Sequence, residues 1–340
     1  MSYSVHTATR SVSLEFFERM CRFMQSQKQS ELSKGWQILT ELCHVEVEKL
    51  AREGRALDLA IHFTTLFRRL DIGGVDLPPN FTDDQLRDYT LKQIRLAGIF
   101  LGELPVPNPE QPLEITPNYE RILDSLEKAF KAPLSTEGCG NSRYVQIGER
   151  KIHARLIEFA VMSLLVGDYW WDPNETVDEI LEIGSGSGWL AVAFGLKAKR
   201  PLSYYMIDLP VVSLFAAYQL AAQFGENAVW FSGEDISLKP TDIYFYILGN
   251  TQLPHLFVLD LVINSNSLPE LPWHTASRLL NEACAALRIG GSFASFNHES
   301  TIEGQHRVID LMAEVPCMEQ TERLLYWMRV GYVQEIWQKL

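Results

Sequence analysis

Apolar residues recur every three to four positions through the first third of the chain, which is the spacing of one helix face. This pattern predicts a mostly helical region over residues 13–104. Thr82, Asp83 and Asp84 are typical of a helix start, because a hydroxyl caps free N–H groups and acids favour the first turn. The predicted helices cover residues 14–24, 36–51, 57–70, 83–101 and, further along, 119–130.

Five prolines between Glu103 and Pro117 interrupt the helical pattern. Proline removes a backbone donor and fixes φ, so this stretch predicts an extended connector rather than a continuing helix. We therefore expect a helical N-terminal domain over residues 1–117 and a second domain over residues 118–340. In the second domain a long helix is expected from Glu149 to about Gly167.

From residue 175 onward short apolar runs alternate with helical patterns, which predicts a parallel sheet covered by helices. The fold class expected is α/β: a Rossmann-like doubly wound sheet, parallel with a C-terminal antiparallel hairpin, preceded by the helical domain. Strands are predicted over residues 179–183, 202–207, 228–231, 259–264 and 292–296, helices over 214–224 and 276–287, and the hairpin over 323–338.

A glycine-rich turn follows the first predicted strand, in Glu182-Ile183-Gly184-Ser185-Gly186-Ser187-Gly188-Trp189. Glycines let the backbone turn tightly and approach a ligand, and the helix after the turn offers free N–H groups. A dinucleotide site needs glycines at the first, third and sixth positions, and here the sixth is Trp189. Glu182 beside the turn suits a ligand with an ammonium or sulfonium group.

The composition limits which partners and which cell compartment we expect for the chain. The chain is 46% hydrophobic and 11% aromatic, which is enough for a packed core, and its net charge of −13 disfavours nucleic acid and anionic membranes as partners. No apolar run has the length of a membrane span, and Met1–His6 does not begin like a signal peptide. The five cysteines are scattered, so we expect reduced thiols and a cytoplasmic protein.

Polar residues at the predicted strand ends are candidates for holding a nucleotide-type ligand. Asp208 ends the second strand, where it would accept hydrogen bonds from a ribose diol or cap the helix at Pro210. Glu234 and Asp235 follow the third strand and would meet an adenine amine or form a solvated turn. Asn264 opens a polar run, Asn264-Ser265-Asn266-Ser267, that would face a ligand or cap the next segment.

Other candidates lie outside this group. Arg143 sits in a small polar loop, where it would meet a ligand carboxylate or remain solvated. His298 follows the fifth strand, and its ordinary pKa suits proton abstraction near neutral pH. His274 is its competitor, and Glu270 would orient the base or hold the acceptor. We find no spacing of residues typical of a metal site.

Three motifs together resemble class I S-adenosylmethionine-dependent methyltransferases and, within them, a family of bacterial sugar O-methyltransferases. They are Glu182–Gly188, Ile207-Asp208-Leu209-Pro210 and Asp260–Glu270, with Phe296-Asn297-His298 in addition. The resemblance spans about residues 137–300. It implies S-adenosyl-L-methionine as cofactor, bound by Glu182, Gly184, Gly186, Gly188 and Asp208, and a small-molecule hydroxyl as acceptor.

Several alternatives remain open. A phenolic or polyketide hydroxyl is a possible acceptor, since many such O-methyltransferases carry a helical N-terminal region that dimerises; in this chain the region would form a homodimer or a substrate lid. A non-catalytic partner subunit would keep the fold without turnover, but it has no reason to keep the glycines, Glu182 and Asp208. A polyamine synthase would use a different adenosyl donor on the same fold.

Overall fold

The computed structural model describes residues 5–7, 12–28, 44–70, 81–107, 115–135, 143–167, 178–235, 242–249, 253, 258–299 and 305–340. Predictions for residues 36–43, for Cys139 and for most of the loop before Arg143 lie outside these ranges. Side chains are not described for 5–7 and 64–70.

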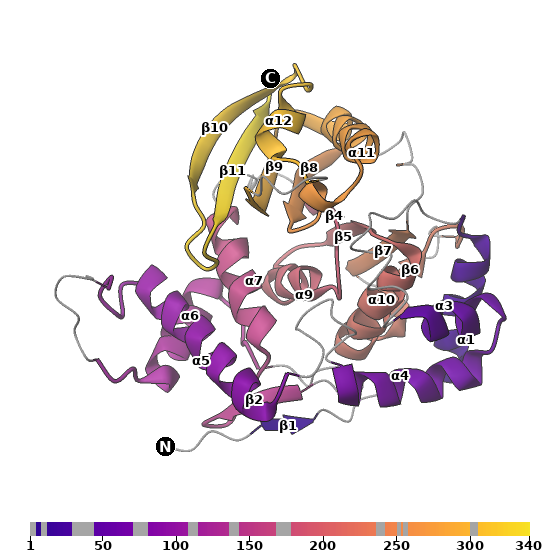
Figure 1. Cartoon of the computed structure of the whole chain (residues 1–340), viewed down its shortest axis with the longest axis horizontal. Coiled ribbons are helices and arrows are strands. Elements are labelled where there is room, and N and C mark those ends of the chain that lie inside the picture. The colour runs from indigo at the N-terminus through magenta and orange to yellow at the C-terminus, as the bar shows by residue number, and fades with distance from the viewer. Residues whose placement is uncertain are drawn as a thin grey trace.

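The centre of the molecule is an eight-stranded sheet in the order β10-β11-β9-β8-β4-β5-β7-β6. Six strands run parallel, and β11 and β10 complete the sheet as an antiparallel hairpin beside β9 (Figure 1). This is the doubly wound α/β fold that the alternating pattern predicts. The strands are β4 (Asp178–Ile183), β5 (Leu202–Ile207), β6 (Val229–Phe231), β7 (Ile243–Gly249), β8 (Leu259–Ser265), β9 (Leu287–His298), β10 (Met318–Leu325) and β11 (Tyr332–Lys339).

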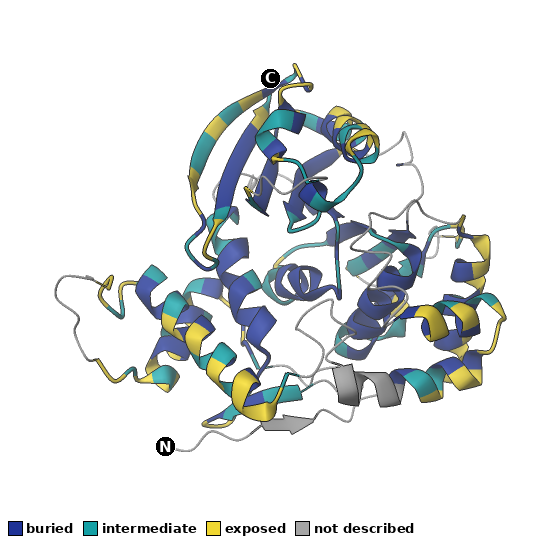
Figure 2. Cartoon of the chain, in the orientation of Figure 1, coloured by how far each residue is buried: buried dark blue, intermediate teal, exposed yellow. Residues whose placement is uncertain are grey.

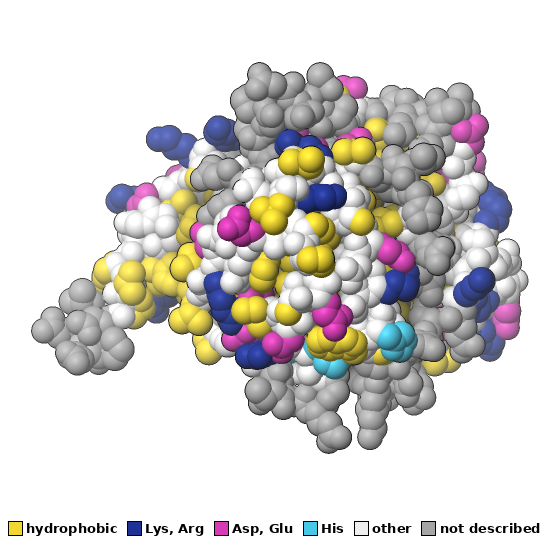
Figure 3. All heavy atoms as spheres, turned by 90° about the horizontal axis from the view of Figure 1, so that it is seen from above, with side chains coloured by type: hydrophobic (Ala, Val, Ile, Leu, Met, Phe, Trp, Pro, Cys, Tyr) yellow, Lys and Arg dark blue, Asp and Glu magenta, His cyan; other side chains and the backbone are white. Residues whose placement is uncertain are grey.

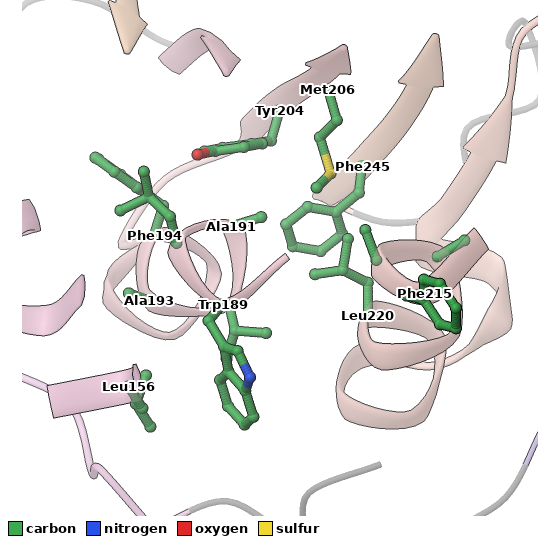
Figure 4. Close-up of a cluster of buried hydrophobic side chains, with 14 of the residues drawn as sticks. Leu156, Trp189, Ala191, Ala193, Phe194, Tyr204, Met206, Phe215, Leu220 and Phe245 are labelled. Atoms are coloured by element: carbon green, nitrogen blue, oxygen red, sulfur yellow. The ribbon is translucent and has the colours of Figure 1, made fainter. Parts of the chain in front are cut away.

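Helices cover both faces of this sheet, and the side chains of each strand alternate between them. On β5, Tyr204 and Met206 join one hydrophobic cluster, and Tyr205 and Ile207 join the other. The strands β8 and β9 and the helix α9 are mostly dark blue in Figure 2, and Figure 4 shows Tyr204, Met206 and Phe245 within the first cluster. That face carries α7 (Ala154–Leu165), α9 (Trp189–Lys197) and α10 (Pro210–Phe224), and the opposite face carries α11 (Trp273–Ala286) and α12 (Val308–Met312).

The N-terminal helices pack against this first face in two groups (Figure 1). Phe16 and Phe23 of α1 contact Phe231 of β6, and Phe63 of α4 contacts Phe215 of α10. α5 and α6 lie instead beside α7. The domain division at residue 117 stays a prediction, although these helices share one core with the sheet. They are α1 (Leu14–Ser26), α3 (Val45–Arg52), α4 (Ala56–Leu70), α5 (Asp83–Phe100) and α6 (Tyr119–Phe130).

Local signals located several elements well. Residues 119–130 and 202–207 form α6 and β5 as predicted, and α5 begins after Thr82, whose hydroxyl accepts from Gln85 N. α10 begins at Pro210, four residues before the predicted start, because proline suits the first helical position. The helix predicted over residues 276–287 forms α11, which ends at Ala286, and Gly290 and Gly291 lie inside β9.

The expected helix from Glu149 was wrong at its start. Residues 143–152 form a hairpin of β2 (Arg143–Ile147) and β3 (Arg150–Ile152), and β1 (Val5–Thr7) pairs with β2. Gly148 takes a positive φ of 58° in the turn, a conformation that glycine adopts readily. The helix α7 then begins at Ala154.

The largest departure is β7, a strand that the sequence interpretation did not include. It lies between β5 and β6, parallel to both. The strand predicted over residues 228–231, which is β6, is therefore separated from β5 by one intervening strand. This shifts the residues after β6 away from the centre of the sheet, which bears on Glu234.

Within the described part of the chain, no helix is long and apolar enough to cross a membrane. Figure 3 looks onto the end of the molecule that carries the C-terminus. On this face the drawn Lys and Arg side chains are interspersed with Asp and Glu. The mixture fits a chain with 43 acidic and 30 basic residues.

Candidate active site at the switch point of the sheet

The chain order of the strands reverses direction between β4 and β8. From β4 the chain proceeds to β5, then to the edge strand β6 and back to β7, and it then crosses to β8 and β9 on the other side of β4. In open parallel sheets ligands bind at the carboxyl ends of the strands at such a switch point. Gly184, Asp208 and Asn264 all stand there, at the ends of β4, β5 and β8.

The turn after β4 has a backbone that requires glycine. Gly184, Gly186 and Gly188 have φ values of 76°, 54° and 84°, a region that residues with a Cβ seldom adopt. A Cβ on Gly184 would also overlap the Ser267 hydroxyl. The Gly184 N–H donates to Ile207 O at 2.7 Å, so the turn is held against the end of β5.

Asp208 joins the glycine turn to the start of α10. Its Oδ2 accepts from Gly186 N at 2.7 Å, and its Oδ1 accepts from Leu209 N at 2.6 Å. Burial raises the pKa of Asp208 to about 7, although both backbone N–H groups oppose the rise. Each carboxylate oxygen has a second lone pair, so the group keeps acceptor capacity for a diol. The ribose role remains a prediction with which this geometry agrees.

Glu182 is buried on the face of the sheet that α9 covers. Its Oε2 accepts from the Tyr204 hydroxyl at 3.0 Å. Burial raises the pKa of Glu182 well above its usual value, and the nearby Asp208 charge adds to this effect. A cationic ligand group would reverse the shift, because an opposite charge favours the carboxylate.

Two buried polar atoms beside the turn have no hydrogen-bond partner among the described residues. They are the Ser185 hydroxyl and the Trp189 indole N–H. Buried polar groups are nearly always paired, so orphans at a glycine turn indicate a place for a polar ligand. With Glu182 and Asp208, they make the turn a fit for a ligand that carries an amino-acid end and a ribose.

Arg143 belongs to the neighbourhood of this turn through His153. The His153 ring stacks on Trp189 with centroids 4.0 Å apart, and burial, Arg155 and Arg143 lower the pKa of His153 to about 3. The Arg143 guanidinium also binds the Asp83 carboxylate at 2.9 Å and Phe81 O at 2.7 Å. Its predicted contact with a ligand carboxylate stays a prediction.

Asn264 has a different place from the one expected for a cofactor ligand. Its amide N donates to Ile183 O at 2.7 Å and to the Ser267 hydroxyl, and its Oδ1 accepts from Asn297 at 2.7 Å and Leu268 N at 3.5 Å. These bonds occupy the two donors and two lone pairs of the amide. Asn264 therefore ties β4, β9 and the segment after β8 together, and the geometry favours a supporting role.

Glu234 is also engaged elsewhere. Its carboxylate binds the Arg19 guanidinium of α1 at 2.7 and 2.8 Å and accepts from Phe231 N at 2.9 Å. It follows β6, which β7 separates from β5. This arrangement disfavours the predicted adenine contact for Glu234, and Asp235 next to it is exposed.

His298 lies at the end of β9 with polar and aromatic neighbours from β11 and the β10–β11 turn. Its ring is 5.8 Å from the ring of Tyr332, the residue directly opposite it on β11. The Tyr332 hydroxyl donates to Asn266 Oδ1. Burial and the charge of Arg329 lower the pKa of His298, which keeps the ring neutral and able to accept a proton.

The two competing residues lie differently. Glu270 ends the short helical turn η4 (Leu268–Glu270), and its charge influences both Asp208 and Tyr332, which places it between the two halves of the site. His274 is exposed on the first turn of α11, which covers the other face of the sheet from that of α7. His298 follows Phe296 by two residues and so points to the α7 face.

The sequence interpretation missed Arg329, Tyr332, Glu158 and His153. All four reach the site only through strand pairing or helix packing, so no local motif marks them. Arg329 and Tyr332 lie near Gly331 in the predicted hairpin. That hairpin was the one local signal that could have pointed to them, through its pairing with β9. Among the described residues, no three His, Cys, Asp or Glu side chains gather as a metal site requires.

Comparison with known proteins gives a limited picture. No protein-family model matches the chain, and no curated protein matches it. Magnesium protoporphyrin IX methyltransferase from Synechocystis PCC 6803 with bound SAM is 14% identical, over 55% of this chain and 80% of that one, with a TM-score of 0.38. Glycopeptide N-methyltransferase MtfA complexed with sinefungin is 11% identical over 54% and 86%, with a TM-score of 0.39.

A third similar structure is the mitomycin 7-O-methyltransferase MmcR, which is 13% identical over 55% of this chain, with a TM-score of 0.37. The match spans 57% of that enzyme. All three are methyltransferases by name, and they act on different substrates. Likenesses this weak carry no conclusion about the reaction of this chain. The doubly wound fold is assigned from its strand order and its two helical layers.

Proposed function

We propose that this chain is an S-adenosylmethionine-dependent O-methyltransferase that acts on a hydroxyl of a small molecule, a sugar or a glycosylated metabolite. The observation that carries the proposal is the bond between Asp208 and Gly186. It fixes a carboxylate next to a turn of three positive-φ glycines at the switch point of a parallel sheet. A ribose-bearing ligand with a cationic end suits this combination.

The residues around the turn would hold the two ends of S-adenosylmethionine. Asp208 would accept hydrogen bonds from the ribose hydroxyls. Glu182 would ionise opposite the ammonium or sulfonium charge, and Trp189 Nε1 and Arg143 would face the carboxylate. The bound cofactor would supply a methyl group on a sulfonium sulfur, which an acceptor oxygen can displace.

On the acceptor side the chain would activate that oxygen. His298 is neutral near pH 7 because its pKa is lowered, so a ring nitrogen can take the hydroxyl proton as the oxygen becomes a nucleophile. Tyr332 packs against the ring and is itself held by Asn266, which limits the rotation of His298. General-base catalysis of this kind contributes about 10²–10⁴-fold to the rate.

The neighbours of His298 support a hydroxyl-rich acceptor rather than a flat phenolic one. Tyr332, which packs on His298, interacts with Asn266, Glu270 and Arg329, and together these side chains offer donors and acceptors of hydrogen bonds. Sugars are recognised through several such groups at once, because each unpaired buried hydroxyl is costly. The reaction type and the acceptor class are both open to direct measurement.

Titration calorimetry with S-adenosylmethionine tests the cofactor assignment. We expect saturable binding that Asp208→Ala weakens at least tenfold. Asp310→Ala is the matched control, because Asp310 is an exposed partner of Arg307 on α12. Absence of binding in the micromolar range would refute the proposal, and tighter binding of the decarboxylated donor would favour a polyamine synthase.

A screen of hydroxyl compounds with methyl-labelled donor tests the acceptor. The panel should contain neutral sugars, acidic sugars, sugar phosphates and phenols in equal amounts. Label in a sugar product supports the proposal. Label confined to phenols would assign the alternative acceptor class, and binding of the donor without label in any product would support a non-catalytic partner subunit.

A further inference from the structure

A buried ionic cluster lies where α5, α7 and the turn between β10 and β11 meet. Glu158 of α7 is fully buried, and its Oε2 accepts from Arg155 Nη1 at 2.6 Å. Its Oε1 is 3.5 Å from Arg329 Nε in the hairpin turn. Tyr89 of α5 interacts with Arg155 in the same cluster. Among the described residues the cluster thus contains two guanidinium groups and one carboxylate, which leaves one positive charge in excess.

Arg329 is the member of this cluster that reaches the proposed base. Its guanidinium carbon lies 4.5 Å from the centre of the Tyr332 ring. The same Tyr332 ring is 5.8 Å from the ring of His298. The Arg329 side chain is 25% exposed, so its charge is largely shielded from solvent. A stacked guanidinium with one end fixed is held in a defined orientation.

Most hydrogen-bonding capacity of Arg329 is unused. A guanidinium has five N–H donors, and the long contact from Nε to Glu158 is its single polar contact with the described residues. The Tyr326 hydroxyl, in the same cluster, is buried and has no partner among the described residues. The Arg329 nitrogens are not among the buried polar atoms that lack a partner, so its remaining donors stay accessible to a ligand.

We propose that Arg329 binds an anionic group of the acceptor, a carboxylate or a phosphate, and so presents the neighbouring hydroxyl to His298. Planar guanidinium groups bind both anions through two parallel hydrogen bonds. The acceptor class is then an acidic or phosphorylated sugar rather than a neutral one. This inference rests on the proposed function, because it assigns a substrate group to the same site.

The charges around His298 agree with this arrangement. Arg329 is a cause of its lowered pKa, and an anion bound to Arg329 would raise that pKa again. The Arg323 guanidinium forms ion pairs with both Glu299 and Glu335, so it offsets part of the negative charge of these two carboxylates. The titratable and charged groups that interact in this region include Glu299, Arg307, Arg323, Tyr326, Arg329, Tyr332, Glu335, Tyr89, Arg155, Glu158 and Glu270.

NMR of the histidine ring carbons tests the inference without turnover. The full chain, with ¹³C-labelled histidine, is titrated with D-glucuronate, D-glucose 6-phosphate and D-glucose. The resonance lost in His298→Gln identifies His298. We expect glucuronate, glucose 6-phosphate or both to shift this resonance saturably and to raise the pKa of His298, with D-glucose far weaker. The anion that binds more tightly distinguishes a carboxylate from a phosphate.

Variants at Arg329 complete the test. Arg329→Gln should weaken anion binding about tenfold or more, the effect of losing a charge-assisted hydrogen bond, and Arg329→Lys should recover part of it. Arg278→Gln, which alters an exposed pair with Glu282, should bind as the wild type does. Equal binding of D-glucose and both anions, no binding of either anion, or an unchanged Arg329→Gln overturns the inference.

Failure of the anion site can be distinguished from failure of the proposed function. Binding of S-adenosylmethionine is measured by calorimetry on the same samples, and it reports both the cofactor assignment and correct folding of each variant. Anion binding that disappears in Arg329→Gln while cofactor binding persists supports the anion site. If the wild type does not bind the cofactor, the methyltransferase proposal is refuted, but the anion titration can still be interpreted.

Discussion

The Asp208 carboxylate accepts a hydrogen bond from the Gly186 N–H at 2.7 Å, so that the end of β5 and the turn after β4 form one unit. Twenty-two residues separate the two partners along the chain. The bond fixes the glycine turn before any ligand binds. A change in the charge of Asp208 would therefore also affect the glycine turn.

Binding of S-adenosylmethionine should depend on pH through Asp208. Its pKa is raised to about 7, and a ribose diol donates best to the ionised form. Affinity should therefore be highest above pH 7 and fall about tenfold per pH unit below it. Calorimetry between pH 5.5 and 8.5, in two buffers of different ionisation enthalpy, measures the affinity and the released proton. A flat profile would contradict the ribose role.

The same pKa predicts how Asp208 affects stability without ligand. A carboxyl whose folded pKa exceeds its unfolded value of about 3.8 holds its proton more tightly in the folded state. Its stabilising contribution is present below pH 4 and is lost as pH rises to about 7. Asp208→Asn should therefore be relatively more stable than the wild type at pH 8 than at pH 5, as urea unfolding at both values would show.

Gly184→Ala should destabilise the chain more than Gly102→Ala. The two glycines have nearly equal φ values of 76° and 74°. A Cβ on Gly184 would overlap Ser267, whereas nothing lies within 4 Å of one on Gly102. The left-handed conformation alone costs about 1–2 kcal/mol, and the overlap adds to it. If both variants lose the same free energy of unfolding in denaturant, the turn at Gly184 can shift to accommodate a Cβ.

Glu158→Ala should be strongly destabilising, by about 3–5 kcal/mol, because it leaves the Arg155 charge buried without its partner. Glu48→Ala is the matched control, since its pair with Arg52 is partly exposed and worth about 0.3–0.5 kcal/mol. Urea unfolding monitored by circular dichroism compares the two. A Glu158 variant as stable as the Glu48 variant would mean that the cluster is hydrated and that its charges are screened.

His298→Gln should lower turnover by about 10²–10⁴-fold and change cofactor affinity by no more than a few-fold. With the wild type, kcat/KM should fall only below the lowered pKa of His298, because the ring must be neutral to take the proton. His274→Gln serves as the control. An acid limb that persists unchanged in His298→Gln would remove this residue from the mechanism.

Much of the fold follows from local patterns in the sequence. The apolar run 202–207 forms β5, the periodic segment 119–130 forms α6, and the three glycines mark the tight turn. In each case neighbouring residues decide the outcome: a strand that is buried on both faces must be apolar throughout, and a positive φ favours glycine. The same reasoning placed Asp208 at the carboxyl end of its strand.

The remaining features depend on contacts between distant segments. The position of β7 between β5 and β6 and the ion pair of Glu234 with Arg19 disfavour the predicted ligand contact of Glu234, and no local pattern specifies the order of parallel strands. The sequence suggests a ligand contact for Asn264, whereas the structure shows its amide hydrogen-bonded to Asn297 and Ile183.

The acceptor side illustrates the same division. The sequence alone suggested His298 as a candidate base, from its residue type and its place after a predicted strand, and that role stays a prediction. Only the antiparallel register of β11 with β9 brings Tyr332 opposite it, and only the packing of the hairpin turn on α7 adds Arg329 and Glu158. The sequence thus determined the glycine turn and the strand ends, because their chemistry is local. Tertiary structure decided which polar groups are already paired, because pairing depends on which segments meet.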